Sequence, residues 1–117
     1  MRITITGTQL EITPALNIYV LKRLESLANH IKPFEKSGEM LLRVEIARST
    51  KHHKKGEEIY YVEFTIALPK KTIRIEQYNA NVRKAVDEAQ RRIKSAISDY
   101  KDLLVEKKKK TTERIYV

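Results

Sequence analysis

Two spacings of apolar residues alternate along this chain, one typical of strands and the other of helices. Apolar and polar residues alternate in residues 2–6, 42–47, 60–68 and 72–77, so each segment is predicted to form a strand with one apolar face. Helical spacing follows Thr13 and Pro14, because Thr13 can cap a helix and Pro14 fits its first position. Pro33 is expected to end this helix, whose apolar stripe comprises Leu16, Tyr19, Val20, Leu24, Leu27 and Ile31.

A second and longer helical pattern begins after Asn79 or Asn81, either of which can cap it. Its apolar stripe comprises Val82, Val86, Ala89, Ile93, Ile97, Tyr100 and Leu104. The predicted order is therefore β-α-β-β-β-α, with turns at residues 35–39 and 69–71 and a polar loop from Arg48 to Gly56. Strands with one polar face are typical of a sheet covered on one side. We predict an α+β fold, a two-layer sandwich with two helices on one face of a four-stranded sheet, in which the first β-α-β unit can be a parallel crossover.

Length and composition indicate one soluble domain. The chain has 117 residues, of which 41% are hydrophobic and 33% charged, and it contains no cysteine, which excludes disulfides and thiolate catalysis. No segment approaches the ~20 consecutive apolar residues of a membrane-spanning helix. The first residues alternate like a strand and lack the apolar run of a signal peptide. We therefore expect a cytoplasmic protein without a membrane partner, composed of a domain at 1–105 and a basic tail at 106–117.

Positive charge is the strongest compositional signal. The chain has 24 Lys and Arg against 15 Asp and Glu, a formal net charge of +9 at pH 7. The excess concentrates in the loop from Arg48 to Lys55 and in the second helix, which ends in the run from Lys107 to Lys110. Such a surplus on a small domain attracts polyanions. We expect the polyanion to be nucleic acid, because each phosphate that Lys or Arg neutralises releases condensed counterions.

The second helix offers the first candidate binding residues. Helical spacing places Arg83, Lys94 and Lys101 on one strip beside the apolar stripe, and it places Lys84 and Arg91 on the outer side. Arg92 flanks the opposite edge. An ordinary solvated helix face is the alternative interpretation, since acidic residues interleave with these cations.

Two further basic segments support the same interpretation. The loop carries Arg48, Lys51, Lys54 and Lys55 without an acidic residue before Glu57, so it can follow a phosphate backbone. Lys107 and Lys108 begin a run of four lysines that a polyanion would neutralise. The alternatives are a hairpin loop kept soluble by its charge and a frayed C-terminal tail.

Residues that could hold a metal or perform catalysis form no recognisable arrangement. His52 and His53 are adjacent, so in an extended loop they point apart, and their spacing does not match that of zinc ligands. The three glycines are isolated and provide no phosphate-binding loop. The sequence suggests no nucleophile–histidine–acid set. We therefore expect no catalytic residue, metal, cofactor or small-molecule substrate.

The uncovered face of the predicted sheet is a weaker candidate for RNA binding. Tyr61 is predicted to point to this face, and exposed tyrosines can stack on unpaired bases. The same face holds cations and carboxylates in alternation, an arrangement that suits cross-strand pairing. We therefore expect the partner to meet the helical side. The mixed-charge residues are Arg43, Glu45, Glu63, Arg74 and Glu76.

Several segments resemble the ribosome hibernation promoting factors, also called ribosome-associated inhibitors or sigma modulation proteins. The resemblance covers roughly residues 1–105 and depends on Met1-Arg-Ile-Thr-Ile-Thr-Gly7, Glu11-Ile-Thr-Pro-Ala-Leu16, Arg23-Leu-Glu-Ser-Leu27 and Ala85-Val-Asp-Glu-Ala89. It implies a short form or the N-terminal domain of a longer member. It also implies binding to ribosomal RNA of the small ribosomal subunit, in the channel for mRNA and tRNA, which silences translation during stress or stationary phase. Lys22 and Arg23 on the first helix then join the basic residues of the second, and the protein is expected to be monomeric away from the ribosome.

Three other functions compete with this interpretation. A general binder of structured, double-stranded RNA could use the same architecture. A module that docks an acidic protein would bind independently of nucleic acid. An enzyme ranks last, because the sequence contains no arranged nucleophile, base or metal set.

Overall fold

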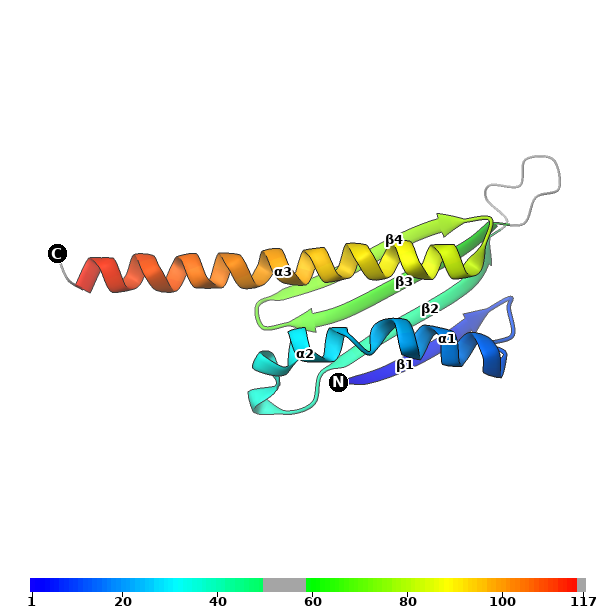
Figure 1. The fold of residues 1–117 in the computed structure, drawn as a ribbon, viewed down its shortest axis with the longest axis horizontal. Coiled ribbons are helices and arrows are strands. Elements are labelled where there is room, and N and C mark those ends of the chain that lie inside the picture. The colour runs from blue at the N-terminus through cyan, green and yellow to red at the C-terminus, as the bar shows by residue number, and fades with distance from the viewer. Residues whose placement is uncertain (50–58, 116–117) are drawn as a thin grey trace.

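The chain forms a four-stranded sheet with its helices on one side (Figure 1). The computed structural model describes residues 1–49 and 59–115, and for 107–115 it describes the backbone alone. The elements in chain order are β1 (Arg2–Thr8), α1 (Pro14–Leu24), α2 (Leu27–Ile31), the 3₁₀ helix η1 (Lys32–Ser37), β2 (Leu41–Ser49), β3 (Ile59–Leu68), β4 (Lys71–Asn79) and α3 (Val82–Ile115).

The strands lie in the order β1-β2-β3-β4, and β1 runs parallel to β2 while the other neighbours are antiparallel. The parallel pair requires a crossover, which α1, α2 and η1 provide. α1 and α3 both lie over the same face of the sheet, and none of the described helices lies on the opposite face (Figure 1). The predicted two-layer α+β sandwich and the parallel first unit are therefore confirmed.

The core lies between the sheet and the helices. Alternate residues of β2 and β3 point into it, and Val62, Phe64 and Ile46 are fully buried. The apolar stripe of α3 contributes four fully buried residues, Val86, Ala89, Ile93 and Ile97, as its helical spacing predicts. This packing holds α3 against β3 and β4 and leaves the rest of its surface free for polar residues.

The first helical segment differs from the prediction of one helix ended by Pro33. α1 ends at Leu24, a turn at Glu25 and Ser26 follows, and α2 and η1 then carry helical structure as far as Ser37. Pro33 lies in the first turn of η1, where a helix does not need the missing backbone N–H. The prediction of a turn at residues 35–39 was therefore wrong for residues 35–37, which belong to η1.

Strand β1 is two residues longer than predicted, since it continues through Gly7 to Thr8. Gly7 is needed for a close approach of the chain, because a Cβ at this position would lie 2.3 Å from the carbonyl oxygen of Leu10. The residues after β1 fold back over this glycine toward α1.

Helix α3 is much longer than the part that packs on the sheet. Its 34 residues correspond to about 50 Å, and Figure 1 shows it projecting well beyond the strands. The Tyr100 ring packs on Phe34 of η1 with 5.4 Å between centroids, and its hydroxyl donates to the Pro69 carbonyl oxygen. The backbone of α3 passes the expected domain boundary at 105, and that division stays a prediction.

Candidate nucleic-acid interface

Helices α1 and α3 lie side by side and run in the same direction. Tyr19 contacts Asp87, Ser26 contacts Gln90 and Phe34 contacts Tyr100, so successive residues of one segment meet successive residues of the other. The start of each helix is capped by a side chain. Thr13 Oγ1 accepts from the Leu16 amide at 3.2 Å, and Asn81 Oδ1 accepts from the Arg83 and Lys84 amides at 3.0 and 3.1 Å. Asn81 is therefore the cap, of the two candidates that the sequence offered.

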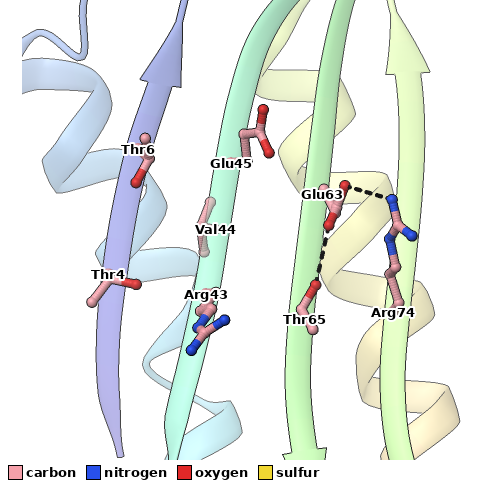
Figure 2. A pocket seen from close by; sticks show the side chains of 8 residues that line it. All are labelled: Thr4, Thr6, Arg43, Val44, Glu45, Glu63, Thr65 and Arg74. Atoms are coloured by element: carbon pink, nitrogen blue, oxygen red, sulfur yellow. Dashed lines mark hydrogen bonds and ion pairs between the residues drawn. The ribbon is translucent and has the colours of Figure 1, made fainter.

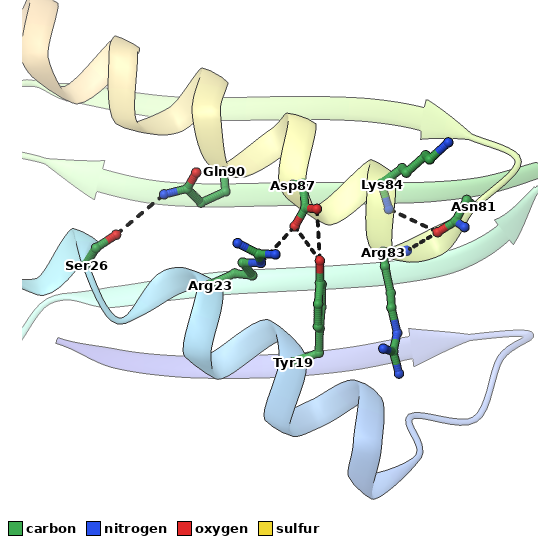
Figure 3. A network of polar contacts seen from close by, with 8 residues as sticks. All are labelled: Tyr19, Arg23, Ser26, Asn81, Arg83, Lys84, Asp87 and Gln90. Atoms are coloured by element: carbon green, nitrogen blue, oxygen red, sulfur yellow. Dashed lines mark hydrogen bonds and ion pairs between the residues drawn. The ribbon is translucent and has the colours of Figure 1, made fainter.

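A polar network joins the two helices near their N-terminal ends (Figure 3). The Tyr19 hydroxyl donates to the two carboxylate oxygens of Asp87, at 2.7 and 2.9 Å. Arg23 Nε lies 3.1 Å from Asp87 Oδ1. The Tyr19 hydroxyl and then the Asp87 carboxylate raise the pKa of Arg23 above its ordinary value. Asp87 is thereby engaged by groups of α1 and does not face solvent as an independent negative charge.

Two guanidinium groups lie against the Tyr19 ring. The Arg23 Cζ atom is 5.1 Å from the ring centroid and the Arg83 Cζ atom is 4.9 Å from it. Figure 3 shows the ring almost edge-on, with the two guanidiniums on opposite sides of it. The stems are held by the ring, while the Arg23 side chain remains 53% exposed.

Six charged residues of α3 lie on two lines, one basic and one acidic. Lys94 and Lys101 follow Arg83 by 11 and 18 residues, which is close to three and five whole turns, so the three residues lie on one line. This line faces the first helical segment, because Arg83 stacks on Tyr19 and the Lys101 Nζ atom lies 5.9 Å from the Phe34 ring centroid. A second line, about 140° around the helix, has the same spacing and is acidic. Its members are Glu88, Asp99 and Glu106.

We call the cations gathered along α1 and the facing strip of α3 the basic seam. It comprises Lys22, Arg23, Arg83, Lys94 and Lys101. Lys84 and Arg91 lie beside it on the outer surface of α3, as predicted. In the part of the chain that the structure describes, Lys22, Lys84, Arg91 and Lys94 are exposed and make no ion pair.

Arg92 lies at the opposite edge of α3 and is used within the fold. Its guanidinium donates to the Glu76 carbonyl oxygen at 2.6 Å and to Gln77 Oε1 at 2.8 Å. Glu88 beside it accepts from the Gln77 and Asn79 amide groups at 2.6 and 3.0 Å. This edge fastens α3 to β4, so Arg92 is the predicted site residue with the clearest structural role.

The uncovered face of the sheet carries carboxylates and arginines together, and Figure 2 shows Glu45 and Glu63 with Arg43 and Arg74. Strand register places Glu45 opposite Glu63, and Glu63 opposite Glu76. Arg74 pairs with Glu63 of β3 at 3.1 Å, as the predicted cross-strand pairing requires, and with Glu76 of its own strand at 2.9 Å. These residues line or border a shallow depression of about 410 Å³. Arg2, Arg43 and Arg74 offset the charge of Glu45, Glu63 and Glu76 on this face. The helical side, where cations are in surplus, is therefore favoured for a nucleic-acid partner.

The remaining predicted residues can be placed only in part. Arg48 is exposed near the end of β2. Lys51, Lys54 and Lys55, together with His52 and His53, lie outside the described residues. Lys107 and Lys108 lie in the backbone of α3, and their side chains are not described. Among the described residues, no group of three or more His, Asp or Glu side chains could hold a metal ion.

Sequence reasoning missed four residues of this region. Tyr19 was assigned to the core and Asp87 to a solvated face, although each lies one turn from an arginine of the same helix, a spacing that indicates a contact. Lys32 and Lys36 belong to η1, which contacts Lys101 through Phe34, and both are exposed. Their segment was predicted as the end of the first helix and a turn, so these lysines were not considered.

The family of the chain follows from comparison with known proteins. The model of the family described as "Sigma 54 modulation protein / S30EA ribosomal protein" matches residues 3–105. The chain belongs to this family. The match confirms the resemblance noted in the sequence and covers β1 through the part of α3 that packs on the sheet. No curated protein matches the chain significantly.

Two solved structures of similar proteins share the fold. The N-terminal domain of Thermus thermophilus Protein Y is 27% identical, with 86% of this chain and 99% of that chain covered and a TM-score of 0.66. A ribosomal subunit interface protein from Coxiella burnetii is 21% identical, with 87% of this chain and 99% of that chain covered and a TM-score of 0.67. This second likeness is one of fold. None of the helices in the described residues is both long and apolar enough to span a membrane.

Proposed function

We propose that this protein binds the small ribosomal subunit through the basic seam and silences translation by occupying the channel for mRNA and tRNA. Membership of a family described as ribosomal supports a ribosomal partner. The name of the Coxiella burnetii structure, a ribosomal subunit interface protein, supports the same partner. The protein would act in the cytoplasm, during stress or stationary phase.

The observation that carries the proposal is the sorting of charge on the helical layer. Cations from two helices lie on one seam, and Asp87, which lies beside the basic strip of α3, is engaged by Tyr19 and Arg23. Glu88, Asp99 and Glu106 lie on the far strip of α3, Asp102 lies on the outer line of Lys84, and Glu45, Glu63 and Glu76 lie on the uncovered face of the sheet. A polyanion is therefore attracted to the helical side, whereas arginines and carboxylates offset one another on the uncovered face.

Inhibition by steric occlusion fits this surface better than a catalytic mechanism does. Arginine and lysine bind phosphate through charge and hydrogen bonds without changing it, and the seam offers no arranged nucleophile or base among its described residues. The long α3 gives the domain an extended shape, 65 Å in its longest dimension, suited to contact with several phosphates of a folded RNA. Binding would then block other ligands of the same channel.

Sucrose-gradient sedimentation with purified small subunits tests the proposal. We expect the protein to migrate with the subunit at low salt, to leave it as salt rises, and to reduce the binding of tRNA and mRNA to the same subunits. Protein that stays at the top of the gradient would contradict ribosome binding. Protein that binds without reducing tRNA or mRNA binding would contradict occlusion. A large excess of duplex RNA should compete poorly, and equal competition would favour a general binder of structured RNA.

A further inference from the structure

The Tyr19 ring holds two cations of the basic seam that come from different helices. Arg23 lies one turn after Tyr19 on α1, and Arg83 lies one turn before Asp87 on α3. α1 therefore contributes the pair Tyr19 and Arg23, and α3 contributes the pair Arg83 and Asp87. The Tyr19–Asp87 hydrogen bonds connect these two pairs. Because each guanidinium carbon is about 5 Å from the ring centroid, the two carbons lie no more than 10 Å apart.

This arrangement restricts both arginines and leaves their side chains exposed, although Arg23 shares its charge with Asp87. A free arginine has many rotamers, and immobilising it upon binding costs free energy. Here the ring face and the Asp87 carboxylate have already restricted Arg23, and the other ring face has restricted Arg83. The Arg23 side chain is still half exposed and Arg83 is exposed, so both can reach a ligand.

The covered ring also limits what kind of contact is made here. A base cannot stack on Tyr19, because guanidiniums occupy both faces of the ring (Figure 3). The groups left to face a ligand are two cations with N–H donors, which match phosphate oxygens. The contact is therefore with the RNA backbone and is independent of base sequence.

Given the proposed function, we propose that Tyr19 is a positioning residue that fixes Arg23 and Arg83 for neighbouring phosphates of the RNA backbone. Asp87 supports it by anchoring the Tyr19 hydroxyl. Tyr19 itself touches no RNA. Its contribution is to affinity, through two side chains that are ordered before binding.

The ordering can be tested without any ribosome. In a nitrogen–proton NMR spectrum, the Nε–H signals of Arg23 and Arg83 should be displaced by the ring current of Tyr19, relative to that of Arg91. Tyr19→Phe keeps the ring and should keep the displacement, whereas Tyr19→Leu should abolish it. Undisplaced signals in the parent protein would overturn the positioning role, whatever the protein binds.

The effect on binding is measured as the dissociation constant for purified small subunits, on variants shown by circular dichroism to be folded at the assay temperature. Tyr19→Leu should weaken binding about tenfold, the cost of ordering two long side chains again, while Tyr19→Phe should stay within about threefold of the parent. Tyr78→Leu, which removes a 41% exposed tyrosine from the uncovered sheet face, should have no effect.

The outcomes separate the two proposals. If Tyr19→Leu binds like the parent, or if Tyr19→Phe loses as much affinity as Tyr19→Leu, the positioning role is wrong and the proposed function is unaffected. Equal losses in Tyr19→Phe and Tyr19→Leu would show that affinity depends on the Tyr19 hydroxyl, which joins the two helices, and does not depend on the ring. If the parent protein does not bind small subunits while the NMR displacement is present, the proposed function fails and the ordering of the arginines stands.

Discussion

Removing one lysine from each helix of the basic seam should weaken ribosome binding in a salt-dependent way. The variant is Lys22→Gln with Lys94→Gln, two exposed side chains that make no ion pair in the described part of the chain. Such surface changes alter the free energy of unfolding by no more than about 0.5 kcal/mol. A change in affinity can therefore be attributed to the lost charges.

The magnitude follows from counterion release. Each phosphate neutralised contributes about 0.7 to 0.9 to the slope of log affinity against log salt concentration, so losing two should lower the slope by about 1.6. If the two proteins bind equally near 1 M salt, the variant should bind about a hundredfold more weakly at 50 mM and about tenfold more weakly at 200 mM. The loss must therefore shrink as salt rises.

The assay is titration of labelled protein with purified small subunits at several salt concentrations. The matched control is Arg2→Gln with Arg43→Gln, which removes two exposed cations from the uncovered sheet face and lowers the net charge equally. Its slope should equal that of the parent protein, because these arginines neutralise no phosphate. Equal slopes for the seam variant and the control would refute the reasoning, since the effect would then be one of net charge alone.

Three predictions concern stability. Leu24 is fully buried, so Leu24→Ala should lower the free energy of unfolding in urea by about 3 kcal/mol. Leu21→Ala, at a 39% exposed position of the same helix, should lower it by less than about 1 kcal/mol. Equal losses would contradict the packing of α1. Asn81→Ala removes the cap of α3 and should cost about 1 kcal/mol in the same measurement, and an unchanged midpoint would exclude the cap. The Met40 amide, and after it the N-terminal ammonium, hold the pKa of Glu35 below its ordinary value of 4.5, so the stabilisation by its carboxylate is present above that pH and is lost as pH falls through the lower folded value. The stability difference between the parent and Glu35→Gln should therefore be constant near neutral pH and disappear in acid, and a difference that persists in acid would contradict the assignment.

Much of the fold could be predicted because the sheet is covered on one side only. Strict alternation in β2 and β3 marks which residues face the helices, and Val44, Val62 and Phe64 are buried as that alternation requires. The end of the first helix could not be predicted in the same way. Pro33 ordinarily stops a helix, but it is tolerated in the first turn of a new one, and the tight turn before α2 leaves no clear signal in the sequence.

In the candidate site, too, some features could be predicted from the sequence and others depend on packing between elements. Helical spacing alone placed Arg83, Lys94 and Lys101 on one strip, because spacing within a helix is fixed. Which element that strip faces depends on packing between helices, and the Tyr19–Asp87 contact joins residues 68 positions apart. The internal role of Arg92 was hidden for the same reason, since its partners belong to β4.

Site-specific photocrosslinking to the small subunit tests the central claim most directly. A photoreactive phenylalanine in place of Lys94 lies on the basic seam, and one in place of Arg43 lies on the uncovered sheet face. We predict that the probe at 94 crosslinks to ribosomal RNA of purified small subunits and that the probe at 43 does not. Crosslinks to RNA from 43 with none from 94 would show that the sheet, and not the helical seam, faces the ribosome.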